Sequence, residues 1–395
     1  MNKIPKSLSN ANIANKTVLV RVDFDVPFNN GSIIDDTKIR AAIPTIQLLL
    51  KNNCKVILLS HLGDPKGKQD DTLSLMDVRF VLGRLLEKQI KFANIAACEN
   101  SIKFMDFGEV LLLENLRFSP FETSKKSEDR ASYVEVLVKL ADAYVFEAYG
   151  IDANVASVTG VAVKLPTYSG LHFEQEVATA KKLAELKAPI TAVLGGSDIQ
   201  NKIELLQVLV QKNNTLLLGG NLAYYFLKSM GVEVGDFEGD AKLLSKIEKI
   251  IKIAQKNKAE IVLPVDHITA SSKDNKVHEI TTQQITKGLT GMDIGPKTLV
   301  TFREILEGAK NVIWDGAMGN YTVEEFSKGT EAVGEYIALS TPKECFKVAI
   351  GSDVAQAMTL LKIKPKRFNF ISLDRTLLTD FIQGKESDIL ALLSK

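Results

Sequence analysis

The feature that most constrains the fold of this sequence is a regular alternation of short apolar runs with longer amphipathic runs. TVLVRVDF, KVILLSHL and EVLLLENL have the length and composition of buried strands, and TKIRAAIPTIQLLLKN carries apolar residues at helical spacing. A second series of the same kind runs from PITAVLGG through NVIWDGAMG to RFNFIS. Strands that alternate with helices predict βαβ units on parallel sheets, and therefore an α/β fold.

Breaks in this alternation divide the chain into four segments. With 395 residues the chain is too long for one ordinary core, so two domains are expected. We predict an N-terminal α/β domain at 1–168, a connecting helix at 169–188, a C-terminal α/β domain at 189–372 and a C-terminal segment at 373–395. The connector contains LHFEQEVATAKKLAELK, which has helical spacing throughout.

Charge and composition exclude several classes of partner. The net charge is +1 with 25% charged residues, so no basic surface for nucleic acid or an anionic membrane is expected. No apolar run approaches the roughly 20 residues of a membrane span, and the N-terminus lacks the apolar core of a signal peptide. We therefore expect a cytoplasmic protein with a small-molecule partner. Cys54, Cys98 and Cys345 lack metal-ligand spacing and are expected to be buried thiols.

Polar residues and glycines gather at the predicted carboxyl ends of the strands, where parallel α/β sheets bind their ligands. In the first half these residues are Asp23, Asp25, His61, Asp64 and Arg117. In the second half they are residues 195–202, Gly219, Gly220, residues 315–319 and residues 351–353. Two sets of this kind predict a small-molecule site in a cleft between the two domains.

Six stretches at these strand ends carry specific signatures. They are RVDFDVP, SHLGDPKG, LLENLRF, DAYVFEAYG, DIGPKT and WDGAMG. In the same order they resemble the signatures RVDFNVP, SHLGRP, ENLRF, DAYVNDAFG, DIGPKT and WNGPMG of the phosphoglycerate kinase family. The resemblance covers nearly the whole chain. It implies two Rossmann-like domains joined by a hinge helix, and a monomer whose C-terminal segment returns to the N-terminal domain.

The resemblance also implies roles for individual residues. The N-terminal domain would bind phosphoglycerate and the C-terminal domain MgADP or MgATP. Arg117 and Lys202 match catalytic positions, and the substrate would contact Asp23, Asp25, Lys38, His61 and Arg117. The nucleotide would contact Lys202, Gly219, Gly220, Gly316, Gly351 and Asp353, with Asp353 as the magnesium ligand.

The substrate side departs from the family pattern where positive charge is needed. Phosphoryl transfer depends on cationic groups and donors around a transition state rich in oxygen charge. Lys38, Asp64 and Asn154 stand where the family has arginines, and of these only Lys38 is positively charged. Asp25 replaces an asparagine and adds a carboxylate beside Asp23. The predicted phosphoglycerate site is therefore short of positive charge.

The nucleotide side departs in the same direction. Asp198 stands at a lysine position, which leaves Lys202 of a lysine pair, and Asp315 replaces an asparagine. We interpret Asp198 as a helix N-cap beside Ser197. Asp374 lies in SLDRTLL, where the family has the glycine-rich phosphate turn STGGGAS. Binding of MgATP or MgADP is therefore expected to be weak or absent.

Three functions remain open on the sequence alone. In the first, the chain has lost phosphoryl transfer and acts as a binding or regulatory protein toward a small molecule or an unknown protein partner. In the second, it is a divergent but active kinase, with compensating charge from residues such as Lys66, Lys125 or Arg375. In the third, the cleft binds a different, non-anionic ligand.

Overall fold

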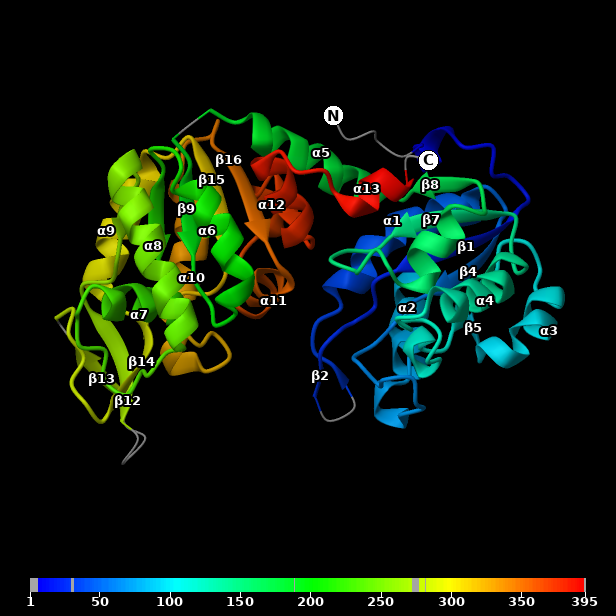
Figure 1. Ribbon diagram of the computed structural model, residues 1–395, viewed down its shortest axis with the longest axis horizontal. Helices are drawn as coiled ribbons and strands as arrows, with labels where there is room; N and C mark the ends of the chain where they lie inside the picture. Colours follow the sequence, from blue (N-terminus) through cyan, green and yellow to red (C-terminus); the bar gives the residue numbers. More distant parts are fainter. Residues whose placement is uncertain (1–5, 30–31, 188, 272–276, 281, 394–395) are drawn as a thin grey trace. The chain divides into compact units, whose positions relative to one another are not determined.

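The structure of the protein, a computed structural model, describes residues 6–29, 32–187, 189–271, 277–280 and 282–393. The chain forms two compact units, which we describe separately. The first contains the residues up to Lys181 together with those from Thr376 onward, and the second contains Lys182–Arg375. Figure 1 shows each unit as strands flanked by helices.

The first unit is built on a parallel sheet of six strands in the order β5-β6-β4-β1-β7-β8. The strands are β1 (Thr17–Val22), β4 (Lys55–Leu59), β5 (Ile90–Ala93), β6 (Val110–Leu113), β7 (Ala143–Glu147) and β8 (Thr167–Ser169). The short antiparallel pair β2 (Phe28–Asn29) and β3 (Ser32–Ile33) follows β1. The carboxyl ends of β1, β4 and β6 thus lie at one edge of the sheet.

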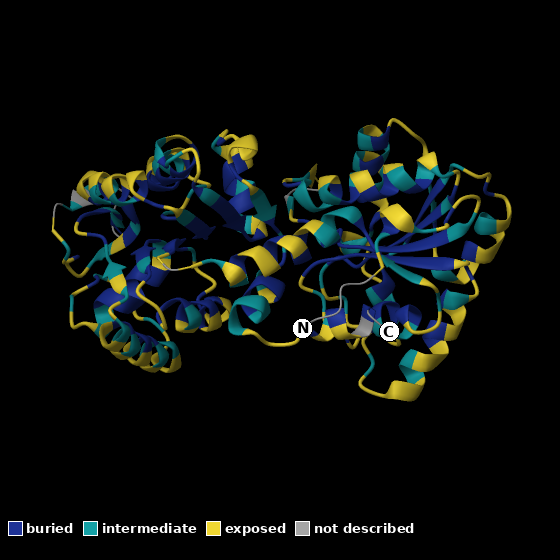
Figure 2. Cartoon of the chain, turned by 90° about the horizontal axis from the view of Figure 1, so that it is seen from above, coloured by how far each residue is buried: buried dark blue, intermediate teal, exposed yellow. Residues whose placement is uncertain are grey.

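Helices cover this sheet because the strands are apolar on both sides. The helices are α1 (Thr37–Lys51), α2 (Met76–Leu86), α3 (Cys98–Lys103) and α4 (Ser127–Val138). Val18, Val20 and Val22 of β1 pack in one core cluster with Ile46 of α1 and Leu82 of α2. Figure 2 shows the buried strands between helices whose outer sides are exposed. The helical spacing predicted from the sequence produces this burial pattern.

The second unit repeats the architecture. Its parallel sheet has the order β11-β10-β9-β15-β16-β17. The strands are β9 (Thr191–Leu194), β10 (Thr215–Leu218), β11 (Glu260–Val262), β15 (Asn311–Asp315), β16 (Phe346–Ile350) and β17 (Phe370–Ser372). The helices are α6 (Ile203–Leu209), α7 (Gly220–Ser229), α8 (Ala241–Asn257), α9 (Pro296–Glu307), α10 (Lys328–Glu335) and α11 (Ser352–Leu360). Trp314 of β15 is fully buried in its core.

An additional antiparallel sheet belongs to the second unit. It consists of β12 (His267–Ser271), β13 (Val277–Ile280) and β14 (Leu289–Ile294) in the order β13-β12-β14. Leu289 of β14 packs with Tyr224 of α7 in a small core cluster. This sheet therefore extends the unit beside α7, as Figure 1 also shows.

Three further helices complete the chain. They are α5 (Leu171–Glu185), α12 (Arg375–Gln383) and α13 (Asp388–Leu393). α5 occupies most of the stretch for which the sequence predicts a connecting helix, and it begins in the first unit and ends in the second.

The three cysteines are buried free thiols, as predicted. Within the described residues, none of the helices combines the length and apolar character that crossing a membrane requires.

Candidate functional site

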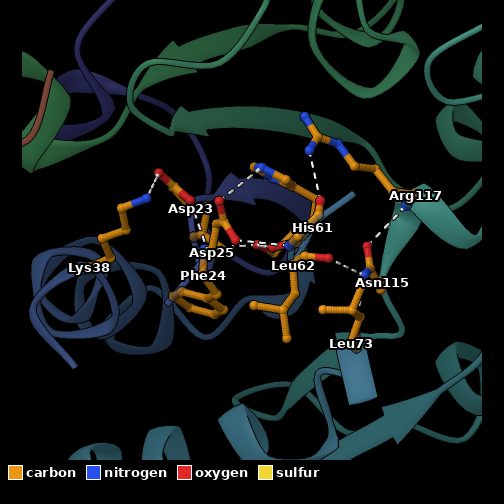
Figure 3. A network of polar contacts seen from close by, with 12 residues as sticks. Asp23, Phe24, Asp25, Lys38, His61, Leu62, Leu73, Asn115 and Arg117 are labelled. Carbon is orange, nitrogen blue, oxygen red and sulfur yellow. Dashed lines mark hydrogen bonds and ion pairs between the residues drawn. The ribbon is translucent and has the colours of Figure 1, made fainter. Parts of the chain in front are cut away.

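Five of the predicted substrate-side residues lie together in the first unit. Asp23 and Asp25 follow β1, His61 follows β4, Arg117 lies in a short 3-10 turn after β6, and Lys38 is in the first turn of α1. Figure 3 shows these side chains around one edge of the sheet. We call them the N-terminal cluster. The parallel sheet brings them together because β4, β1 and β6 end at the same edge.

Asp23 neutralises the nearest lysine of this cluster. Its carboxylate is buried, with Oδ2 2.8 Å from Lys38 Nζ. Its Oδ1 accepts a hydrogen bond of 3.0 Å from the backbone N–H of Asp25. Lys38, whose side chain is only 18% exposed, is therefore committed to an internal ion pair. An anionic ligand would have to compete with Asp23 for this ammonium group.

His61 is neutral in this cluster. Its Nδ1 accepts a hydrogen bond of 3.2 Å from the buried guanidinium of Arg21, which leaves the hydrogen on Nε2. Burial, and then the charges of Arg21, Arg117 and Lys38, lowers the pKa of His61 to about 2. The 3.8 Å between Nε2 and Asp25 Oδ2 is too long for a hydrogen bond. His61 therefore offers a neutral donor and no positive charge.

Arg117 is held by the loop that follows His61. One guanidinium nitrogen donates to the carbonyl of Gly63 at 2.8 Å, and the backbone N–H of Arg117 donates to Asn115 Oδ1 at 3.1 Å. The backbone N–H of Gly63 in turn donates to Asp25 Oδ1 at 2.9 Å. This chain of contacts, part of which Figure 3 shows, fixes Arg117 close to the extra carboxylate of Asp25.

The two remaining arginine positions supply no positive charge. Asp64 is exposed on the loop after β4. Asn154 is also exposed, and both its backbone N–H and its Nδ2 donate to Asp152 Oδ1, at 2.8 and 3.1 Å. The loop around Asn154 is thus stabilised by a local turn to Asp152. The N-terminal cluster keeps the expected positions without the expected excess of positive charge.

The second unit contains a cluster of three carboxylates and two cations. We define the C-terminal cluster as Asp198, Lys202, Asp315, Asp353 and Arg375. Asp315 ends β15 and is fully buried. Its two carboxylate oxygens accept bonds of 2.7 Å from Nε and a terminal nitrogen of Arg375. Lys202 Nζ donates to the same carboxylate, and to the Asp315 carbonyl at 3.2 Å.

These contacts keep Asp315 ionised. Burial alone would raise the pKa of Asp315, but Lys202 and Arg375 outweigh burial, and the pKa is lowered. The same balance raises the pKa of Arg375, since Asp315, Asp353 and Asp198 outweigh the effect of burial. The bidentate geometry is the arrangement in which arginine binds carboxylates and phosphates most strongly. Here that geometry is used by a carboxylate of the protein itself.

The other two carboxylates lie near the terminal nitrogens of Arg375. Asp198 Oδ2 and Asp353 Oδ1 are each 3.8 Å from its terminal nitrogens, and their side chains are 53% and 40% exposed. The prediction that Asp198 caps a helix is wrong. Residues Gln200–Lys202 form a 3-10 turn, and Asp198 Oδ2 accepts from the Nδ2 of Asn201 at 2.8 Å.

The predicted glycines form tight turns around this cluster. The N–H groups of Gly196 and Gly220 donate to the carbonyls of Ala317 and Met318 at 2.7 and 2.8 Å. The N–H of Gly219 donates to the Leu194 carbonyl at 2.9 Å. Gly316, with φ 101°, lies so close to Gly195 that an added Cβ would be 2.4 Å from its carbonyl oxygen. The backbone packing alone therefore requires glycine there.

Gly351 brings the carboxylate of Asp353 and the guanidinium of Arg375 close together. Its φ is 94°, and an added Cβ would lie 2.6 Å from Asp353 Oδ1 and 3.0 Å from a nitrogen of Arg375. Gly351 immediately precedes α11, in whose first turn Asp353 lies. The close packing of the C-terminal cluster therefore requires glycine at this position.

A cavity of about 460 Å³ adjoins the C-terminal cluster. Its lining includes four glycines, two tyrosines and one aspartate, namely Gly196, Gly220, Gly291, Gly319, Tyr224, Tyr321 and Asp353. This volume lies in the range of small-molecule sites. Among the described residues that line it, none is lysine, arginine or histidine, and Asp353 is the one charged side chain.

These residues do not fit the phosphates of a magnesium nucleotide. Both cations of the C-terminal cluster are committed to Asp315, and a phosphate beside Arg375 would face the carboxylates of Asp198 and Asp353. The N–H groups of Gly196 and Gly220 already have backbone acceptors. Within the described part of the chain, no group of three or more His, Cys, Asp or Glu residues could hold a metal ion.

The fold and the two clusters define a class of protein. Two parallel α/β units, with charged residues at their strand ends and a cavity in one of them, make this a two-domain α/β protein. A family model described as Phosphoglycerate kinase matches residues 8–385. The chain belongs to the phosphoglycerate kinase family.

Individual relatives agree with this assignment. A phosphoglycerate kinase of Bifidobacterium longum (strain DJO10A) is 37% identical over 381 residues, which cover 94% of this chain and 95% of that protein. A phosphoglycerate kinase structure from Pyrococcus horikoshii OT3 has a TM-score of 0.85 at 28% identity, and one from Coxiella burnetii has 0.76 at 29%. Each covers 98% of both chains. The predicted family and the predicted two-domain α/β fold are confirmed.

Sequence reasoning missed part of the site. It placed Arg375 among several compensating cations and did not pair it with Asp315. It also omitted Arg21, which contacts His61. The sequence did contain a signal for the contact between Asp315 and Arg375. Asp315 replaces a neutral asparagine of the family pattern and Arg375 replaces a neutral glycine, so the two replacements add opposite charges. Such complementary departures indicate a contact.

Proposed function

We propose that this phosphoglycerate kinase-family protein has lost, or keeps only at a strongly reduced level, phosphoryl transfer between ATP and 3-phosphoglycerate. It would act instead as a binding or regulatory protein, for a small molecule or for a protein partner. The proposal includes weak binding of magnesium nucleotides. Family membership supports the kinase-like ancestry of the fold, and the charges of the two clusters support the loss.

The observation that carries this proposal is the commitment of Lys202 and Arg375 to Asp315. A phosphoryl-transfer site must present positive charge to a transition state whose charge lies on oxygen. Here one buried carboxylate already takes both cations, and Asp198 occupies the family's lysine position. Unit charges about 4 Å apart interact by roughly 4 kcal/mol at an effective dielectric near 20. The carboxylates therefore oppose the reaction they adjoin.

The N-terminal cluster supports the same conclusion independently. Lys38 is paired with Asp23, and His61 is neutral. Arg117 remains as the matching arginine, with Asp25 attached to the same loop. Loss of charge in two separate units is difficult to reconcile with a single compensating substitution.

A coupled assay tests the proposal. The purified chain is incubated with 3-phosphoglycerate and MgATP, and the acyl phosphate formed is reduced by glyceraldehyde-3-phosphate dehydrogenase with consumption of NADH. The phosphoglycerate kinase of Bifidobacterium longum serves as the positive control, and Lys202→Met of this chain measures the background. We expect the unmodified chain and Lys202→Met to give the same rate. A rate well above that of Lys202→Met would refute the loss of activity.

One observation favours a second candidate, a divergent active kinase. Arg375 lies 3.8 Å from Asp198, so its guanidinium brings a positive charge to the neighbourhood where the family places a lysine. In this reading Arg375 would leave Asp315 when a nucleotide binds. The same assay decides, since Arg375→Gly would then abolish a measurable rate. In an inactive protein Arg375→Gly leaves the background unchanged.

A further inference from the structure

The C-terminal cluster bears on ligand selection as well as on catalysis. Asp315 is at the end of β15 with no exposed surface, and its carboxylate holds Arg375 by two bonds of 2.7 Å. Both residues depart from the family pattern, Asp315 from asparagine and Arg375 from glycine. The pair is therefore a feature of this chain, and its effect on the adjoining cavity can be worked out from its charges.

Asp353 connects the pair to the cavity. Asp353 lines the cavity, and its Oδ1 lies 3.8 Å from the terminal nitrogen of Arg375 that also donates to Asp315. The two cations of the C-terminal cluster face three carboxylates, those of Asp198, Asp315 and Asp353, so the cluster has a net charge of −1. The cavity thus receives a negative field from its one charged lining residue. A ligand carrying phosphate would be repelled there.

The remaining lining suits an uncharged ligand with a flat ring. Gly196, Gly220 and Gly291 line the cavity without side chains, and Tyr224 and Tyr321 belong to the same lining. Uncharged polar side chains are also present, namely Ser197, Asn221, Thr290 and Asn320. Their amides and hydroxyls can exchange hydrogen bonds with the ligand's own polar groups. A volume of about 460 Å³ is enough for a molecule of nucleoside size.

We propose that Asp315 is the specificity-determining residue of this cavity, and that by sequestering Arg375 and Lys202 it makes the cavity select uncharged, ring-bearing ligands and reject their phosphorylated forms. This inference rests on the proposed function, because a working kinase site would need the opposite selection. It names a ligand class for the cavity, whereas the proposed function leaves the bound molecule unspecified.

Calorimetry with adenosine and ADP tests this selection. Each is titrated into the full-length chain, once with magnesium chloride and once with EDTA. We expect adenosine to bind the unmodified chain at least as tightly as ADP in both conditions. In Asp315→Asn, Lys202 and Arg375 are released toward the cavity, and the preference should shift toward ADP by about tenfold or more. Asparagine is close in size to aspartate, so the change is small in volume.

A second variant keeps the test decisive if Asp315→Asn does not fold. Asp353→Asn removes the one charge of the cavity wall at a side chain that is 40% exposed, and it should also shift the preference toward ADP. Glu307→Gln is the matched control, since Glu307 ends α9 near the start of β15, at the opposite end of the strand from Asp315. It should leave both affinities unchanged.

The outcomes separate this inference from the proposed function. ADP binding at least about tenfold tighter than adenosine in the unmodified chain overturns the inference. So does the absence of adenosine binding at millimolar concentration, or an unchanged preference in Asp353→Asn. The turnover assay is independent of all three results. An inactive chain that prefers ADP would keep the proposed function and lose the inference, and an active chain would lose the proposed function itself.

Discussion

At the scale of single residues, the chemistry of the second unit depends on one buried carboxylate. Asp315 is the shared partner of two cations, the buried Lys202 and the largely buried Arg375. Breaking a buried ion pair by removing one partner is strongly destabilising, whereas replacing both partners by apolar groups can be nearly neutral. The fold of this unit should therefore depend on Asp315 even without any ligand.

We expect Asp315→Ala to lower the free energy of unfolding by roughly 3–5 kcal/mol, because it leaves Lys202 and Arg375 without their shared partner. Adding Lys202→Met should recover part of this loss, since a methionine no longer needs a carboxylate. Asp198→Ala, at a half-exposed position, should change stability by about 1 kcal/mol or less. Urea denaturation of the four proteins measures these differences. Equal effects of Asp315→Ala and Asp198→Ala would contradict the prediction.

A second residue-scale prediction concerns the lysine position. Asp198→Lys restores the family's charge, and a single well-placed donor can contribute about 10² to 10³ in rate. We expect no gain in turnover. The new ammonium would lie near Arg375, where Asp198 now lies 3.8 Å from its guanidinium, and two like charges there repel. Groups that act as a unit also respond non-additively to single repairs. Turnover above background in the coupled assay would disprove this.

At the scale of elements, a buried aspartate ties the small sheet to a helix. Asp293 in β14 accepts hydrogen bonds from its neighbour Ile294 at 2.8 Å and from Gly329 of α10 at 2.6 Å. Burial raises the pKa of Asp293 to about 7, although the two N–H donors act in the opposite direction. The same aspartate lies close to Gly319, which lines the cavity. The ionisation of Asp293 is thus linked to the packing beneath the cavity.

This linkage gives a pH dependence with a definite sign. The pKa of Asp293 is raised above its unfolded value of about 3.9. The stabilisation of the folded state by the protonated carboxyl is therefore fully present below a pH of about 3.9, and it is lost as the pH rises toward 7. Within this window the free energy of unfolding falls by about 1.4 kcal/mol per pH unit. We expect the melting temperature of the unmodified chain, relative to Asp293→Asn, to fall between pH 4.5 and pH 7.5. A constant difference across this range would show that Asp293 does not titrate there.

Elements and turns were more predictable than contacts between side chains. The strands and α5 follow from apolar spacing along the sequence, and the glycine turns at Gly196 and Gly316 follow from local backbone requirements. The N-cap prediction for Asp198 failed because the chain forms a 3-10 turn before α6 begins at Ile203. No local sequence signal distinguishes an α-helix that begins just after Asp198 from a 3-10 turn followed by an α-helix at Ile203.

The contact between Asp315 and Arg375 could not be predicted from local sequence patterns. The two residues are 60 positions apart and meet because β15 and the start of α12 lie at the same end of one unit. Which of three nearby carboxylates receives the bidentate contact depends on side-chain packing. Periodicity and spacing carry no information about that choice, whereas the sum of the charges could be read from the sequence.

At the scale of the whole molecule, both units are more negative at their strand ends than the family pattern, while the family fold is kept. In the first unit, Asp25, Asp64 and Asn154 stand at family positions for asparagine and arginine, and in the second unit the C-terminal cluster contains Asp198 and Asp315. Phosphoryl transfer requires the substrate's carboxylate and the nucleotide's phosphates to be held at the same time. We therefore expect that a repair confined to one unit leaves the other partner of the reaction weakly bound.

The last prediction tests this requirement with two half-repaired proteins and their combination. The first carries Asp64→Arg and Asn154→Arg, and the second carries Asp198→Lys, Asp315→Asn, Asp374→Gly and Arg375→Gly. We expect both half-repaired proteins to stay at the background rate of Lys202→Met in the coupled assay, because each leaves one substrate facing carboxylates. Turnover should rise above background only in the combination, since contributions to one transition state are not additive. Melting curves of all three establish that they are folded. Clear turnover by either half-repaired protein would place the missing charge in one unit alone, and the carboxylates of the other would then be compatible with catalysis.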